Sequence, residues 1–213
     1  MGRRPTDEAQ EHGWCVVNIN VLEVLTEEEY ERKSKRRKPG RRLDDLGPVT
    51  SERRDDWPTP PEFLHHVYRF GDVALDPCPS RMGVVVAKEY SWLDEGRDGL
   101  SDDWASVVRR VGGGCVFVNP PYSDSVSWLS KCEVEAKKGI DILTLVPART
   151  DTRWFHSLTA TRACFVKGRI KFMGATAGAR FPSVVLYWGA HGGHFHQTFN
   201  RIGRVVELGL SLD

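Results

Sequence analysis

Short apolar runs alternate with helical segments from Trp57 onward, and this alternation restricts the possible folds more than any other feature. Residues 61–70 (PEFLHHVYRF) place apolar side chains near helical spacing, behind a proline suited to a first turn. Residues 73–75 then predict a short buried strand that ends at Asp76. Further strands are predicted at residues 84–87, 115–118 and 140–146. Strands that alternate with helices indicate an α/β fold with a mainly parallel sheet.

The last part of the chain brings its predicted strands closer together. Residues 125–138 have the periodicity of an amphipathic helix, through Val126, Leu129 and Val134, and Gly139 closes it. The later strands are predicted at residues 164–166, 170–172 and 184–188. Because little helix separates them, we expect the sheet to finish in an antiparallel C-terminal strand pair.

The first 56 residues differ in composition from the rest. Residues 32–42 (RKSKRRKPGRR) hold eight Lys or Arg in eleven positions. Such a run cannot bury enough apolar surface to order itself, so it is either a solvated tail or an arm that binds phosphate non-specifically. We therefore expect residues 1–56 to form a partly disordered N-terminal extension and residues 57–213 to form one domain.

Cysteine and histidine patterns give no support for a metal site or a redox motif. The five cysteines include no CxxC pair. His191, His194 and His196 lie close together without a nearby Cys, Asp or Glu, so we expect a solvated loop there and no metal. The sequence has no signal peptide and no apolar run near the ~18 residues of a membrane span, which predicts a cytoplasmic protein without a membrane partner. A net charge of +1 neither favours nor excludes a polyanionic partner.

Asn119-Pro120-Pro121-Tyr122 directly follows the predicted strand 115–118, at the kind of position where ligands of open α/β sheets bind. An amino group attached to a π system is a poor nucleophile, because its lone pair is delocalised. The Asn119 side-chain carbonyl and the Pro120 main-chain carbonyl could each accept a hydrogen bond from such a group and turn its lone pair out of conjugation. The two prolines stiffen the loop, and Tyr122 offers a flat face for a planar substrate. The motif favours a site that activates an amino group, against the alternative of an ordinary turn.

Six sequence blocks, in order, resemble the phage-type DNA N6-adenine methyltransferase (Dam-like) family. They are WPTP (57–60), LDPC (75–78), DGL with a following Trp (98–104), NPPY (119–122), LVPARTDT with WF (145–155) and GRIKF (168–172), and FPS (181–183) comes next. The resemblance covers residues 57–188. It implies a Rossmann-like methyltransferase fold, S-adenosylmethionine as cofactor and DNA as partner, in a bacterial host cell or encoded by a phage.

The resemblance also implies which residues hold the cofactor. Thr59 and Pro60 would hold its methionine end, Asp76 its ammonium or sugar, and Asp98 its adenine amino group, with Asn119 bordering it. Each has a structural alternative, since Thr59 and Pro60 can simply start a helix and either aspartate can be a turn residue. The sequence departs from many methyltransferases after Asp76, where PCPSRMG stands in place of a glycine-rich turn.

The substrate is expected at the same edge of the sheet. Tyr122 and Phe172 would face an adenine rotated out of the duplex, although Phe172 can equally belong to the core. A group of basic residues would contact the DNA backbone: Lys167, Arg169, Lys171 and Arg180. The alternative is that these four are scattered surface charges.

The segment Arg149-Thr150-Asp151-Thr152 also follows a predicted strand. Arg149 or Arg153 would contact phosphate, with Asp151 orienting either one. The alternative is that Thr150 or Asp151 caps the helix that contains Trp154.

These residues predict a DNA adenine-N6 methyltransferase, site-specific or of relaxed specificity, with a monomer as the simpler oligomeric state. One alternative is an amino-methyltransferase that acts on RNA or on a protein glutamine. Another is a catalytically silent relative that only binds nucleic acid.

Overall fold

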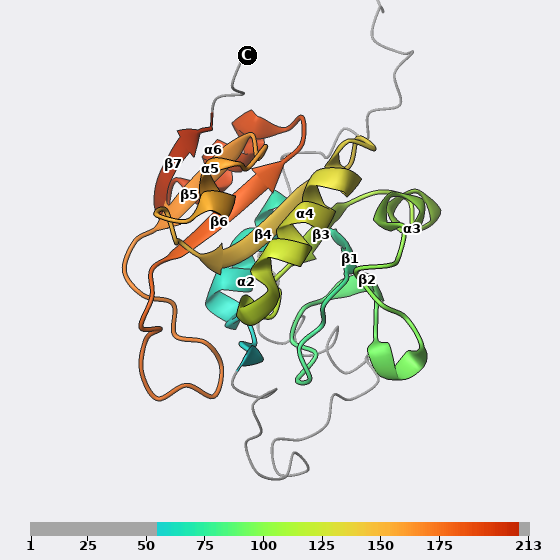
Figure 1. The fold of residues 1–213 in the computed structure, drawn as a ribbon, viewed down its shortest axis with the longest axis horizontal. Coiled ribbons are helices and arrows are strands. Elements are labelled where there is room, and N and C mark those ends of the chain that lie inside the picture. Colours follow the sequence, from blue (N-terminus) through green and yellow to red (C-terminus); the bar gives the residue numbers. More distant parts are fainter. Residues whose placement is uncertain (1–54, 209–213) are drawn as a thin grey trace, which may run out of the picture. The chain divides into compact units, whose positions relative to one another are not determined.

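A computed structural model describes residues 55–208 of the chain (Figure 1). The predicted extension over residues 1–56, with its basic run at 32–42, lies outside the described residues except for its last two positions. Asp55 lies just before the WPTP block, and residue 208 follows the last strand.

One mixed sheet of seven strands organises the described residues. The strands are β1 (Val73–Asp76), β2 (Ala87–Tyr90), β3 (Cys115–Val118), β4 (Ile142–Pro147), β5 (Arg162–Val166), β6 (Ser183–Trp188) and β7 (Gly203–Glu207). Their order across the sheet is β2-β1-β3-β4-β6-β5-β7. The first four strands pair in parallel, whereas β6 is antiparallel to both β4 and β5, and β7 is antiparallel to β5. The α/β class and the antiparallel end of the sheet are therefore confirmed.

Helices cover both faces of the sheet (Figure 1). On one face, α2 (Pro61–Phe70) and α6 (Gly192–Phe199) pack together against the odd-numbered side chains of β3, β4 and β6. On the other, α3 (Trp104–Arg110) and α4 (Ser125–Ala136) cover the alternate residues of the same strands, beside the short α5 (Arg153–His156). Every side chain of β1, β3, β4 and β6 is buried, as expected for strands covered on both faces.

The strand order reverses its direction between β1 and β3. From β1 the chain moves outward to β2, and then returns through α3 to place β3 on the other side of β1. The loops that leave β1 and β3 therefore diverge beyond Asp76 and Val118. In open α/β sheets, this divergence creates the crevice where ligands bind.

Most of the predicted elements are found, but three strands differ from the prediction and the helices α3 and α6 were not predicted. The helix at 61–70 and the strand at 115–118 are confirmed to the residue, and the strand at 73–75 extends to Asp76. The strand predicted at 84–87 begins at Ala87 instead. Residues 170–172 form no strand: Ile170 and Phe172 are buried, but they belong to the long connection between β5 and β6. β7 was not predicted.

The buried face of α4 differs from the predicted one. Val126 and Val134 are 55% and 54% exposed. The face that packs on the sheet instead carries Trp128, Leu129 and Cys132, together with the fully buried Glu135. A buried carboxylate is stable there because its Oε1 accepts hydrogen bonds from two lysines and its Oε2 accepts one from a backbone N–H: Lys131, Lys138 and Ala105.

The three histidines near the C-terminus lie in and beside a helix, so the prediction of a solvated loop was wrong. His191 precedes α6, and its Nδ1 lies 2.8 Å from Asp141 Oδ2. His194 stacks on Phe70 and places its Nε2 3.0 Å from the carbonyl oxygen of that residue. Both side chains therefore fasten α6 to neighbouring elements.

Candidate active site at the ends of β1 and β3

Three hydrogen bonds fix the Asn119 side chain, which directly follows β3. Its Nδ2 donates to the Trp57 carbonyl oxygen (2.6 Å) and to Thr59 Oγ1 (3.0 Å), so both amide hydrogens are used. Its Oδ1 accepts from the Tyr122 hydroxyl (3.0 Å) and keeps a second lone pair for another donor. Thr59 is only 1% exposed. The WPTP segment thus holds the Asn119 amide in one orientation, with its oxygen toward Tyr122.

Four aromatic side chains contact one another beside the Tyr122 partner of Asn119, and we call them the aromatic cluster: Trp57, Tyr122, Phe172 and Phe181. The Trp57 and Tyr122 rings are nearly parallel, with centroids 6.4 Å apart and an interplanar angle of 17°. Phe181 meets Tyr122 edge-on at 5.4 Å, and Phe172 meets it at 6.2 Å. Four of the sequence blocks, WPTP, NPPY, GRIKF and FPS, therefore meet at one place. Phe172 is 1% exposed and belongs to the core, whereas the other three rings are half-buried.

The Tyr122 hydroxyl is a neutral hydrogen-bond donor in this setting. Burial raises its pKa well above the usual tyrosine range, and the nearby Asp55 carboxylate raises it further. Tyr122 therefore does more than present a flat face, because its O–H bond also orients Asn119.

Asp55 anchors the loop that carries Tyr122, and sequence reasoning missed it. Its carboxylate accepts hydrogen bonds from the backbone N–H groups of Tyr122 (2.9 Å) and Ser123 (3.0 Å), and from the Ser123 hydroxyl. The turn Tyr122–Asp124 and α4 follow at once. The carboxylate thus serves the otherwise unpaired donors at the start of this helical segment. No local pattern could identify it, because its partners lie 67 and 68 residues away.

Asp55→Ala is expected to lower the turnover of this site by roughly ten- to a hundredfold, because the Tyr122 backbone loses its anchor and a small displacement is costly at a reacting centre. Asp124→Ala is the matched control. It removes a negative charge from the same segment, but its carboxylate contacts Ser127 and not Tyr122. Turnover measured for both variants should separate them, and equal losses would contradict an anchoring role.

The loop after β1 replaces a glycine-rich turn with a compact proline-containing one. Asp76 is 3% exposed, and its Oδ1 accepts from the Cys78 backbone N–H (3.2 Å). Burial, followed by the Asp76 charge, raises the pKa of the Cys78 thiol well above its usual value, while a hydrogen bond with the Asn119 backbone opposes this effect. The ends of β1 and β3 are therefore joined through Cys78, and Asp76 lies at the predicted position.

The close backbone approach in this region occurs at Gly99. A Cβ there would lie 1.9 Å from the Pro77 carbonyl oxygen and 2.9 Å from Trp128. The buried Trp104 donates its Nε1–H to the Gly99 carbonyl (2.7 Å). The DGL…W block thus packs its loop at Gly99 tightly against the residues that follow β1. Asp98 behaves as a turn residue in this structure, since its two oxygens accept from Leu100 N–H and Ser101 Oγ.

Gly99→Ala is expected to destabilise the protein by about 1–3 kcal/mol, because an added methyl group has no space against the Pro77 backbone. Gly193→Ala is the control, since a Cβ at that position meets nothing within 4 Å. Thermal unfolding of the two variants measures the difference. Equal melting temperatures would show that the loop moves freely away from β1.

The predicted phosphate-binding residues take no part in the hydrogen bonds that position the Asn119 loop within residues 55–208. Arg149, Asp151 and Arg169 are exposed, and no side-chain hydrogen bond or ion pair among residues 55–208 joins them to that loop. The predicted helix cap was wrong: the N-cap residue of α5 is Thr152, and its hydroxyl donates backward to the Arg149 carbonyl (2.6 Å).

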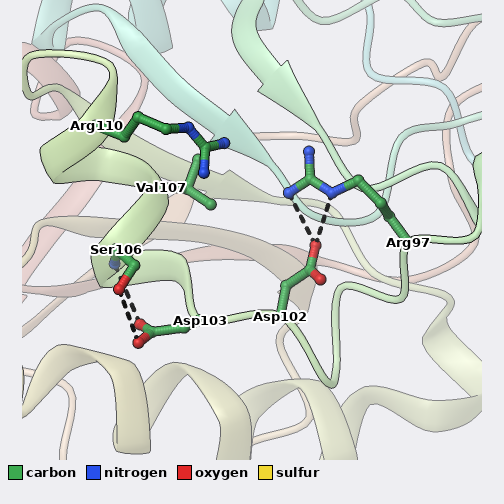
Figure 2. Close-up of a pocket in the computed structure, with 6 residues that line it drawn as sticks. All are labelled: Arg97, Asp102, Asp103, Ser106, Val107 and Arg110. Atoms are coloured by element: carbon green, nitrogen blue, oxygen red, sulfur yellow. Dashed lines mark hydrogen bonds and ion pairs between the residues drawn. The ribbon is translucent and has the colours of Figure 1, made fainter.

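A hollow of about 410 Å³ lies at a different place, between α3 and the preceding loop (Figure 2). Figure 2 shows Arg97 and Asp102 pointing toward one another, with 2.9 Å between Arg97 Nη2 and Asp102 Oδ2. Arg97 also binds Glu89 and the Tyr90 carbonyl. Its charge is therefore already compensated, and none of the predicted site residues lines this hollow.

Within the described part of the chain, no three His, Cys, Asp or Glu side chains gather as metal ligands. None of the helices between positions 55 and 208 is long and apolar enough to cross a membrane.

Comparison with known proteins identifies a family. The sequence model of the family described as DNA N-6-adenine-methyltransferase (Dam) matches residues 48–184, which is more than half of the 213 residues. This range includes Asp55, the Asn119 loop and the whole aromatic cluster. No curated protein and no solved structure matches the chain. The chain belongs to the DNA N-6-adenine-methyltransferase (Dam) family.

Proposed function

We propose that the protein transfers a methyl group from S-adenosylmethionine to the N6 amino group of an adenine that is rotated out of DNA. The observation that carries this proposal is the Asn119 amide, whose orientation is fixed by Trp57 and Thr59 and whose oxygen keeps one lone pair beside the Tyr122 ring. Membership of the Dam family supports adenine in DNA as the substrate.

The site residues act mainly by positioning the amino group. Asn119 Oδ1 and the Pro120 carbonyl oxygen accept one hydrogen each from adenine N6, which directs the nitrogen lone pair away from the ring. Because Asn119 is already oriented, little reorganisation is needed during the reaction. Tyr122 holds the base plane by stacking, with Trp57 as the nearly parallel ring beside it.

When bound, the cofactor supplies an electrophilic methyl group. Asn119 and Pro120 would orient the N6 lone pair toward this methyl group, which the N6 nitrogen would accept. The methylated nitrogen then loses a proton to water, so no side chain has to act as a base. This agrees with the neutral Tyr122 hydroxyl, which acts as a donor.

The residues at the ends of β1 and β3 fit such a cofactor. The Asp76 carboxylate is buried at the end of β1, where it can accept from an ammonium or a sugar hydroxyl. The Ser80 hydroxyl, in the loop after β1, is buried without a hydrogen-bond partner among the described residues. A polar ligand would satisfy it. Asp98 supports the cofactor less directly, because both of its oxygens already accept hydrogen bonds.

Methyl transfer to different acceptors tests this function. The full chain is incubated with methyl-labelled S-adenosylmethionine and, separately, with duplex DNA, RNA and a protein extract. We expect label in DNA, and mass spectrometry of the digested DNA should identify N6-methyladenine. Label in RNA or on protein glutamine would instead favour another amino-methyltransferase. A calorimetric titration without cofactor binding would favour a silent relative.

A further inference from the structure

Charge is divided unevenly along the chain. Residues 152–206 contain no Asp or Glu and eight Lys or Arg, which gives a net charge of +8. Residues 55–151 contain sixteen Asp or Glu and ten Lys or Arg, which gives a net charge of −6. The strands β5, β6 and most of β7 thus belong to a basic half, and β1 to β4 to an acidic one.

The ion pairs follow the same division. In the acidic half, described carboxylates pair with Lys88, Arg97, Arg110, Lys131 and Lys138. In the basic half, Arg162 pairs with Glu207. Seven other cations there form no ion pair with any residue that the structure describes: Arg153, Lys167, Arg169, Lys171, Arg180, Arg201 and Arg204. Their charge is available for an anionic partner.

Three of these cations line one hollow of about 690 Å³, which we call the basic hollow. Lys167, Arg201 and Arg204 contribute the charge, and the exposed Asn200 adds an amide. Gly203 lines it too, and a Cβ there would lie 2.2 Å from the Phe165 carbonyl oxygen. The missing side chain lets β7 pair closely with β5, which brings Arg204 and Lys167 to the same place.

The basic hollow lies at the same edge of the sheet as Asn119. β6 is antiparallel to both β4 and β5, so β5 runs in the direction of β4 and ends at the same edge. β7 begins at this edge, since Gly203 pairs with Val166 at the end of β5. The connection between β5 and β6 leaves from there and carries Arg169 and Lys171, exposed on either side of the buried Ile170.

We propose that the basic hollow binds a backbone phosphate of duplex DNA on one side of the target adenine. This inference rests on the proposed function. Three to four strand spacings of about 4.8 Å separate β3 from β5 and β7, which is about 14–19 Å. At about 3.4 Å per base pair, this places the bound phosphate about four to six base pairs from the adenine.

The positive potential extends beyond the hollow to α2. Burial, and then the charges of His65, Arg69 and Arg201, lower the pKa of His66. Arg69 also forms no ion pair with a described residue. A polyanion at the hollow would relieve this repulsion, whereas a neutral or cationic partner would not.

Charge removal from the full chain tests the proposal. Arg201→Gln/Arg204→Gln removes two exposed charges from the hollow, and Arg109→Gln/Arg110→Gln removes two exposed charges from α3 in the acidic half. Binding of a fluorescent duplex of about 20 base pairs is measured over a range of salt concentrations. The hollow variant should bind more weakly, and the slope of log K against log salt should fall by about 1–2, at about 0.9 per lost phosphate contact. The control should keep the wild-type slope.

DNA length gives a second, independent readout. A duplex that ends about three base pairs on either side of its single adenine is too short to reach the hollow. Wild type should bind this short duplex more weakly than the duplex of about 20 base pairs. The hollow variant should bind the two duplexes with nearly the same affinity. If wild type binds DNA and the two double variants behave alike, the hollow assignment is wrong while the proposed function stands. If wild type binds no DNA, both the hollow assignment and the proposed function are wrong. Cofactor titration of each variant should match wild type.

Discussion

Asn119→Ala is expected to lower the rate of methyl transfer by at least about a hundredfold, and by up to about a thousandfold. The variant loses the side-chain oxygen that accepts from the amino group, and the truncated side chain also leaves the Trp57 carbonyl without its donor. The measurement is the initial rate with saturating labelled cofactor and DNA. Binding of the cofactor itself, measured by calorimetry, should change little, because the lost oxygen acts on the substrate.

Thr59→Val tests whether the Thr59 hydroxyl is needed to orient the Asn119 side chain. It removes one hydrogen-bond partner of Asn119 Nδ2 but keeps the bond to Trp57 and the whole Asn119 side chain. We expect a smaller loss than in Asn119→Ala, together with a modest fall in melting temperature. Full activity in Asn119→Ala would refute the proposed mechanism. Full activity in Thr59→Val alone would show that the Trp57 carbonyl is a sufficient support.

The edge of the sheet that carries the site was predictable from the sequence. Parallel strands end at a common edge, so Asp76 after β1 and Asn119 after β3 had to lie near each other once the alternation of strands and helices was recognised. The order of the blocks also placed Trp57 and Tyr122 in one family pattern. Their ring-to-ring arrangement depends on tertiary packing and had to come from the structure.

Long-range polar contacts were not predictable. The burial of Glu135 was not predicted, because a carboxylate is buried only where it has partners. Two of its partners, Ala105 and Lys138, lie outside α4, so the sequence of this helix does not reveal them. β7 was missed for a related reason. Its side chains are half-buried or exposed, so the sequence lacks the apolar run that marks a central strand.

The missing glycine-rich turn has a structural counterpart. Where many methyltransferases bring backbone close to the cofactor with glycines after the first strand, here the glycine lies in the neighbouring DGL loop. Gly99 lets that loop press on Pro77. The β1 loop can then be stiff, with Cys78 tied to Asp76, and still leave Asp76 at the divergence of β1 and β3. The glycine that permits close backbone packing thus lies in the DGL loop, and the adjacent loop after β1 is the stiff, proline-containing one.

Tyr122→Ala is the second variant with a large expected effect. It removes the stacking face, which contributes about 1–3 kcal/mol per base in other nucleic-acid sites, and so lowers kcat/KM by roughly five- to 150-fold. It also removes the hydroxyl that orients Asn119 Oδ1. Tyr122→Phe keeps the ring and loses only that bond, so its activity should fall by a few-fold at most. The matched pair, measured with the same DNA and cofactor, divides the role of Tyr122 between its two parts. If Tyr122→Phe were as impaired as Tyr122→Ala, the hydrogen bond from the hydroxyl to Asn119 would be the main contribution of Tyr122 to activity. The proposal that the target base stacks against Trp57 and Tyr122 would then be wrong.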